Sequence, residues 1–363
     1  MGRFRMNDPI FAYAREKQIE LSKLVLGRFK IYLDTKFWIL LRETKTPTST
    51  ELIRLLRFGV NSGRLICPVS ASTVIEVAKQ KNTSSRRIGS ARLIDELSLG
   101  VTLLPSEQRA ATEFAHFLSK FNGSCNLYEV RELIWTKIPY ALGYLFPTNS
   151  ELSADENFSF QKYFVDTLWN LSLTDFFGRL SEEKIGWDQQ RSQESARRLS
   201  ADIHHHSSEI KSYQQVYIDE VAGAVDLLGD EFAGFAVYQA RKDGRRAPVR
   251  DSEEWREAKR LCCNMVGNLL RLSPKARFWF PTIHVEASLH AALRWNKGRN
   301  FKANDFFDFE HAVSALAYCD TFFTEKSLCH LVTAKNTNLQ EVNGCSVTAN
   351  LDEAVSIVSN LLY

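Results

Sequence analysis

Residues 31–38 read IYLDTKFW, and this stretch decides the fold class that we predict. Three apolar, β-favouring residues end at Asp34, and a helical pattern then runs from Thr35 to Arg42. A short apolar run closed by a carboxylate is typical of a strand buried on both faces. Because a helix follows that strand at once, the stretch predicts one strand–helix unit of a parallel sheet.

The same alternation of strands and helices continues on both sides of this stretch. In the first 118 residues, besides this stretch, we predict helices at 9–26, 49–58, 70–79 and 107–118 and strands at 64–69 and 100–104. Near the carboxyl terminus, we predict helices at 281–294, 304–317 and 351–362 and strands at 321–324 and 345–348. Alternating elements of this kind indicate an α/β fold with a parallel sheet.

The middle of the chain follows a different pattern. From about 127 to 271 the apolar residues recur at helical spacing with few strand candidates, and the segment is too apolar to be a linker. We therefore predict a sheet domain in two parts, 1–126 and 276–363, with a large α-helical insertion at 127–275.

Composition places the chain among ordinary globular proteins. Its 363 residues are 44% hydrophobic and 25% charged, and the net charge of +3 is too mild to identify a nucleic-acid binder. The seven Cys residues form no CxxC pair, so we interpret them as reduced thiols. The charged amino terminus lacks an apolar signal core, and no apolar run of roughly 18 residues occurs. We expect a cytoplasmic protein with no membrane partner.

Three carboxylates stand where α/β proteins place catalytic groups. Asp34 ends the first strand, Glu76 lies early in the helix after the second strand, and Asp308 lies on the helix before the strand at 321–324. In open α/β sheets the functional crevice lies outside the carboxyl ends of the strands. Each acid alone could be a helix cap or a solvated side chain, but their joint placement predicts a shared site.

Three further acids are candidates beside them. Asp305 lies one turn before Asp308 and shares its helix face. Asp320 precedes the strand at 321–324, whereas Glu325 follows its carboxyl end and is the better placed of the two.

Clustered carboxylates predict a metal site. Without compensating charge they raise one another's pKa values, and hard cations such as Mg²⁺ or Mn²⁺ prefer oxygen ligands. Two such ions about 4 Å apart can activate water and stabilise the leaving oxygen in phosphodiester hydrolysis. The acids therefore predict Mg²⁺- or Mn²⁺-dependent nuclease chemistry.

Three segments of the chain resemble the PIN-like nuclease family. They are IYLDTKFW around Asp34, CPVSASTVIEVAK around Glu76, and NDFFDFEHAVSALAYCDTFFTEK around Asp308. In that family the acids lie in LDT or LDS, in S-x-x-T-x-x-E, and in D-x-x-x-A-x-x-A, and a later strand ends in T-D or T-x-D. The last phrase here reads Thr324–Glu325, so the fourth ligand stays open between Glu325 and Asp320.

The resemblance covers roughly residues 28–120 and 278–362. It implies a PIN-like fold and a Mg²⁺- or Mn²⁺-dependent ribonuclease, often a toxin, a defence effector or an RNA-processing factor. It also implies catalytic roles for Asp34, Glu76, Asp308 and Glu325. RNA is the expected partner, DNA is the alternative substrate, and a catalytically inactive scaffold or nucleic-acid-binding module is a further alternative. An oligomer is possible on this sequence.

Residues for substrate binding come from the stretch before the third acid. Arg294, Lys297, Arg299 and Lys302 could contact a phosphate backbone because they immediately precede Asp308. A second basic cluster at 241–250 is more typical of a solvated loop.

Two residues near the acids have alternative interpretations. Thr35 could orient substrate or a water beside Asp34, or it could cap the next helix. His311 lies one turn after Asp308, where it could contact a phosphate or pack as a core histidine.

Overall fold

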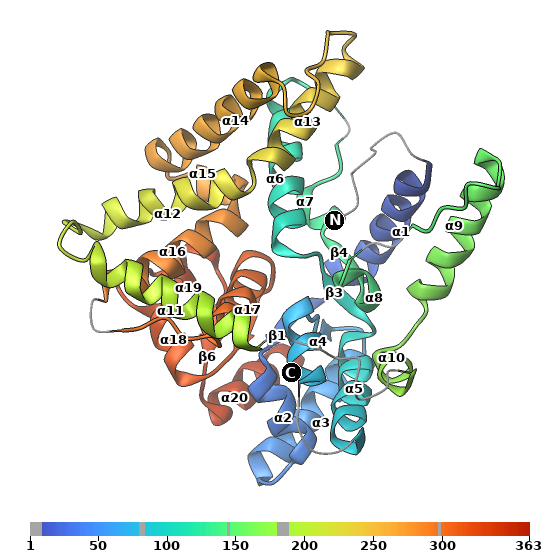
Figure 1. The fold of residues 1–363 in the computed structure, drawn as a ribbon. Helices are drawn as coiled ribbons and strands as arrows, with labels where there is room; N and C mark the ends of the chain where they lie inside the picture. Colours follow the sequence, from blue (N-terminus) through green and yellow to red (C-terminus); the bar gives the residue numbers. More distant parts are fainter. Residues whose placement is uncertain (1–8, 80–83, 126, 144–145, 180–188, 297–298) are drawn as a thin grey trace.

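The computed structural model describes residues 9–79, 84–125, 127–143, 146–179, 189–296 and 299–363. The chain is mostly helical (70%), and the helices surround a small parallel sheet of four strands (Figure 1). The α/β class predicted from the sequence is compatible with this arrangement. The sheet is small, so the helices that cover it form most of the core.

The parallel sheet joins the two ends of the chain. Its strands are β1 (Phe29–Leu33), β2 (Leu65–Ile66), β5 (Thr321–Phe323) and β6 (Ser346–Thr348), in the order β2-β1-β5-β6. All three neighbouring pairs run parallel. Because β1 pairs directly with β5, residues nearly 300 positions apart meet at the same sheet edge.

The two faces of the central strand β1 contribute to two different apolar clusters. Ile31, Tyr32 and Leu33 are fully buried. Side chains alternate across a strand, so Ile31 and Leu33 enter one apolar cluster while Tyr32 enters the other together with Phe322. Tyr32 therefore points to the side of the sheet that α17 (Asp305–Tyr318) covers.

A second, antiparallel ladder lies beside β2. It consists of β3 (Val101–Leu103) and β4 (Trp135–Lys137), and a parallel bridge between Val69 and Thr102 links it to the segment after β2. The prediction of helical structure from 127 onward is wrong at β4. Its three residues stand within a longer apolar stretch whose spacing suits a helix, and only the pairing with β3 defines them as a strand.

Helices follow most of the predicted boundaries in the two sheet-forming parts of the chain. The first part contains α1 (Pro9–Leu26), α2 (Thr35–Glu43), α3 (Pro47–Asn61), α4 (Ala71–Ala78), α5 (Ser84–Ser98) and α6 (Ser106–Phe121). The last part contains α16 (Pro281–Trp295), α17 (Asp305–Tyr318), α18 (Lys326–Thr333), α19 (Leu339–Asn343) and α20 (Leu351–Leu362). The sequence did not predict α18 and α19, which are short helices after β5.

Nine helices are described between these two parts. They are α7 (Val130–Leu133), α8 (Ile138–Ala141), α9 (Ala154–Trp169), α10 (Leu173–Arg179), α11 (Gln189–His205), α12 (Tyr213–Leu227), α13 (Gly229–Lys242), α14 (Glu253–Leu272) and α15 (Ala276–Trp279). None of the described helices is long and apolar enough to cross a membrane.

The middle helices share a core with the sheet-forming parts. α12 packs along α16, and α13 packs on α6 and α14. Phe114 of α6, Phe232 of α13 and Ala287 of α16 belong to one apolar cluster, and the rings of Phe114 and Phe232 stack with centroids 4.3 Å apart. Figure 1 shows α12, α13 and α14 above the sheet, on the side of α6 and α16.

Candidate functional site

Asp34 lies at the carboxyl end of β1, where it also begins α2. Its backbone N–H donates to the carbonyl of Phe323 (3.0 Å), which extends the β1–β5 pairing by one residue. Its carboxylate accepts hydrogen bonds from the Phe37 N–H (3.2 Å) and from the Thr324 hydroxyl (2.6 Å). The side chain is 5% exposed. Burial raises the pKa of Asp34, although the hydrogen bond from Thr324 and the charge of His311 oppose that rise.

Glu76 lies in the second turn of α4 and is bonded from two sides. One carboxylate oxygen accepts from the Thr35 hydroxyl (2.5 Å) and lies 2.7 Å from Nε2 of His311. Burial by itself raises the pKa of Glu76, but the contacts with His311 and Thr35 outweigh it and leave the pKa below its usual value. Glu76 is therefore a charged carboxylate held in one position.

His311 is the central base of this site. It is 1% exposed, and its Nδ1 lies 2.8 Å from the Tyr32 hydroxyl, which in turn bonds Ser70 (2.7 Å). Burial lowers the pKa of His311, but Tyr32 and Glu76 raise it well above the usual value of 6.5. The interpretation of His311 as a packed core histidine is confirmed, and the side chain also contacts a candidate catalytic acid, Glu76.

Asp308 lies in the first turn of α17 and is partly buried. Its carboxylate accepts from the Asn304 amide (3.0 Å). Burial, with the negative charges of Glu325 and Glu76 as further causes, raises the pKa of Asp308 to about 7. The carboxylates of Asp308, Glu76 and Glu325 all line one pocket.

Glu325 follows β5 and precedes α18. The Ser327 hydroxyl donates to its carboxylate, and its charge contributes to the raised pKa values of both Asp34 and Asp308. The carboxyl end of β5 adjoins that of β1, so Glu325 reaches the same edge as Asp34.

These residues line one pocket at the carboxyl edge of the parallel sheet. Its volume is about 260 Å³, and its lining comprises Asp34, Thr35, Lys36, Ile39, Glu76, Asn304, Asp308, His311 and Glu325. Four lining side chains are carboxylates, against two basic side chains, Lys36 and His311. The pocket therefore concentrates negative charge in partly desolvated surroundings.

Asp305 and Asp320 are predicted site residues that do not line this pocket. Asp305 is buried and accepts from the Arg299 guanidinium (2.7 Å) and from the Lys302 N–H (2.7 Å), so it fixes the loop before α17. Asp320 accepts from the N–H of Lys30 (2.7 Å) and pairs with its ammonium (3.0 Å), at the beginning of β5. It lies at the opposite end of the strand from Glu325.

Of the predicted substrate-binding residues that the structure describes, one lies in the pocket and the others lie outside its lining. Thr35 lies in the pocket, as described above. The structure places Arg294 against Glu220 (2.5 Å) and Arg299 against Asp305, so both are engaged in ion pairs outside the pocket lining. Lys302 has an exposed side chain, and Lys297 lies outside the described residues.

The carboxylate oxygens in the pocket suit a hard divalent cation. In the present arrangement, however, these side chains are not close enough together to coordinate one ion. Carboxylate oxygens are what Mg²⁺ and Mn²⁺ prefer, and burial together with the negative charge of Glu325 raises the pKa values of Asp34 and Asp308. Within the described ranges, no three His, Cys, Asp or Glu side chains are grouped closely enough to hold an ion as they stand. Ion binding would thus require these side chains to approach one another more closely than they do here.

Several residues of the site were not identified from the sequence. Tyr32 and Thr324 hold His311 and Asp34 in place, and Lys36 and Asn304 line the pocket. Asn304 precedes Asp308 by one helical turn, which was a usable signal. Tyr32 carried none, because its role depends on which face of β1 meets α17.

Compared with known protein families, curated proteins and solved structures, the chain gives no match. The resemblance to PIN-like nucleases therefore depends on the motifs quoted above.

Proposed function

We propose that this protein is a metal-dependent nuclease that hydrolyses phosphodiester bonds, with RNA as its substrate. One observation carries the proposal. Four carboxylates from four separated segments, Asp34, Glu76, Asp308 and Glu325, line one pocket at the carboxyl edge of a parallel sheet. A fold gains no stability by gathering buried carboxylates, so their convergence favours a functional reason.

The charge balance of the pocket supports a cationic cofactor. Burial and the negative charge of Glu325 raise the pKa values of both Asp34 and Asp308, and a cation bound beside them would lower both pKa values. Bound there, Mg²⁺ or Mn²⁺ would supply the Lewis acidity that lowers the pKa of water and stabilises charge on a leaving oxygen.

The side chains divide into ion-holding and positioning groups. Asp34, Asp308 and Glu325 are the proposed holders of the ion together with Glu76, which Thr35 and His311 keep in a fixed orientation. The choice of RNA follows from the resemblance to PIN-like enzymes, which are typically ribonucleases. DNA is the alternative substrate for the same chemistry.

A catalytically silent nucleic-acid-binding module is the second candidate, and one observation favours it. Glu76 is already paired with a buried imidazole that balances its charge. If that pair stays closed, only three carboxylates remain for an ion.

A cleavage assay on the full chain separates these candidates. Length-matched pools of single-stranded RNA and DNA are incubated with Mg²⁺, with Mn²⁺ or with EDTA. We expect metal-dependent cleavage of RNA that Asp34→Asn abolishes. Asn is as good a helix cap as Asp: its Oδ1 can accept from the Phe37 N–H, and its amide N–H can donate to the Thr324 hydroxyl oxygen, so the variant should fold. Asp243→Asn serves as the control. Asp243 is an exposed carboxylate that pairs with Arg245 and does not line the pocket.

The proposal fails if cleavage persists in folded Asp34→Asn, or if pure wild type cleaves neither pool. Calorimetric titration with Mn²⁺ then identifies the silent module, which would bind RNA while taking up no ion in the pocket.

A further inference from the structure

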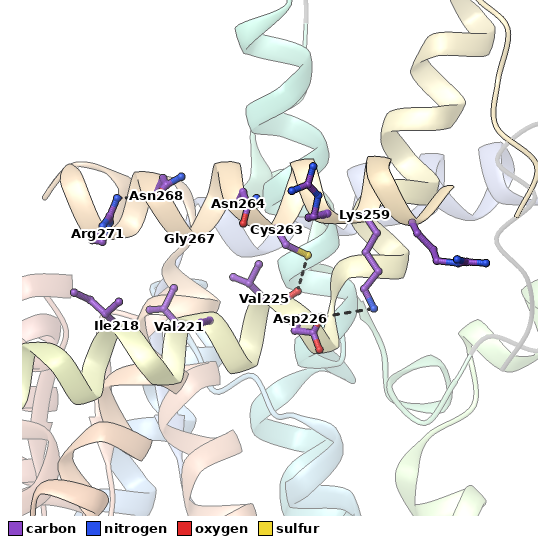
Figure 2. Close-up of a pocket in the computed structure, with 13 residues that line it drawn as sticks. Ile218, Val221, Val225, Asp226, Lys259, Cys263, Asn264, Gly267, Asn268 and Arg271 are labelled. Carbon is purple, nitrogen blue, oxygen red and sulfur yellow. Dashed lines mark hydrogen bonds and ion pairs between the residues drawn. The ribbon is translucent and has the colours of Figure 1, made fainter. Parts of the chain in front are cut away.

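A second concave site lies in the middle helices, between α12 and α14. Its volume is about 590 Å³, more than twice that of the carboxylate pocket. Ile218, Val221 and Val225 project from α12 toward α14 and form an apolar floor (Figure 2). We refer to this site as the α12–α14 groove.

Basic side chains lie at both ends of this groove, three of them near the start of α14 and one near its end. Arg256, Lys259, Arg260 and Arg271 all belong to α14, and Asp226 of α12 is the carboxylate in the lining. The first and last of these arginines are 15 positions apart, which is about 22 Å along a helix. Positive charge at two places this far apart matches a ligand with repeated negative charge better than it matches a single anion.

Two of the arginines have partners that a stronger anion can replace. Arg256 pairs with Glu253 (2.7 Å) and Arg260 with Glu257 (2.8 Å), and about two thirds of each arginine side chain is exposed. Exposed pairs of this kind contribute little to stability. Each guanidinium can therefore turn to a phosphate at little cost, and it can bond two phosphate oxygens at once.

Two glycines show where α14 is closely packed and where it is open. A Cβ on Gly229, at the start of α13, would lie 2.5 Å from Cε of Lys259 and 2.8 Å from Sγ of Cys263, so α13 and α14 are in close contact there. A Cβ on Gly267 would meet no atom within 4 Å. Glycine in a helix interior is unfavourable and packing does not require it at 267, which indicates that open space is needed at this position.

We propose that the α12–α14 groove binds the phosphate backbone of an RNA strand. The choice of RNA rests on the proposed function, whereas the polyanionic character of the ligand follows from the arginines and lysine of α14. The groove would hold substrate outside the carboxylate pocket, which gives the middle helices a role in substrate capture.

Binding is measured by fluorescence anisotropy with a labelled single-stranded RNA pool of about 20 nucleotides, long enough to follow the basic side chains of α14. The full chain carries Asp34→Asn so that the probe stays intact. The groove variant adds Arg256→Gln, Arg260→Gln and Arg271→Gln. The matched control adds Arg54→Gln, Arg57→Gln and Arg245→Gln, which remove the same charge from exposed arginines that also pair with carboxylates.

We expect the groove variant to bind RNA at least about tenfold more weakly than the control. The magnitude of the slope of log K against log salt should also fall by about 2, because each of the three lost phosphate contacts lowers it by about 0.7. A third variant, Gly267→Leu, should weaken binding while the protein stays folded by circular dichroism.

Equal affinity of the groove variant and the control overturns the proposal. It is also overturned if poly-L-glutamate of matched length competes as well as RNA, because the groove would then serve an acidic protein segment. These results are independent of cleavage: loss of binding in the groove variant supports the groove even if the wild type cuts nothing, in which case only the proposed function fails.

Discussion

From the raised pKa of Asp308 we predict that replacing this residue with asparagine increases the free energy of unfolding when no metal is present. The folded-state pKa of Asp308 is raised from 3.8 to about 7 by burial and by its acidic neighbours. An ionised Asp308 therefore destabilises the folded state. An asparagine side chain at this position would have no charge and could still accept the hydrogen bond from Asn304, so the substitution removes the penalty and retains the contact.

The size of the effect follows from the change in pKa. One pKa unit corresponds to about 1.4 kcal/mol, so a rise from 3.8 to about 7 sets a ceiling of about 4 kcal/mol near neutral pH. Asp308 is only partly buried, and water at the pocket mouth screens its charge. We therefore expect a gain in the free energy of unfolding of about 1–3 kcal/mol.

The pH dependence gives the sign an independent check. Below about pH 4 the carboxyl is protonated in both the folded and the unfolded state, so it contributes no penalty. Between about pH 4 and 7 the unfolded state releases this proton while the folded state keeps it, so the penalty grows with pH and then levels off. The difference between Asp308→Asn and wild type should accordingly be largest at about pH 7.5 and disappear near pH 4.

Urea unfolding followed by fluorescence measures this difference, in EDTA and in saturating Mg²⁺. A ligand at about 100 times its dissociation constant adds about 2.7 kcal/mol to the stability of the wild type, and the variant should lack that gain. The reasoning is refuted if the variant is less stable than wild type in EDTA at about pH 7.5, or if the difference does not change between that pH and about pH 4. Asp243→Asn should show neither effect.

Three further substitutions test the surroundings of the two sites. His311→Ala removes the buried partner of Glu76 and should lower the free energy of unfolding by about 2–4 kcal/mol, measured by urea denaturation; an unchanged midpoint would show that the pair is not formed in solution. Arg109→Leu leaves Glu310 without its fully buried partner and should cost about 3 kcal/mol, which calorimetry would reveal as a clear drop in Tm. Gly267→Ala should instead raise the stability by up to about 1 kcal/mol, because the added methyl group enters open space and Ala favours the helix; a lower Tm would contradict the open groove.

Local sequence signals predicted the elements whose ends are defined locally. The helix at 9–26 was predicted with both of its ends, and the helix at 351–362 begins after Asn350, whose side chain caps it. The strands β1 and β5 were recognised because their short runs of β-favouring residues are bounded by polar ones, and β6 was recognised at 345–348. β4 was missed, since its strand character comes from pairing with β3 and not from its own composition.

The sequence by itself determined which acids stand at strand ends and early in helices, because those positions follow from local periodicity and spacing. Only the tertiary structure decided which of them share a pocket. The pairing of β1 with β5 brings Glu325 to Asp34 and leaves Asp320 bonded to Lys30 at the other end of the strand. The same packing joins His311 to Glu76 across 235 positions of the chain. Contacts between distant segments depend on how whole elements pack, and no local pattern of residues carries that information.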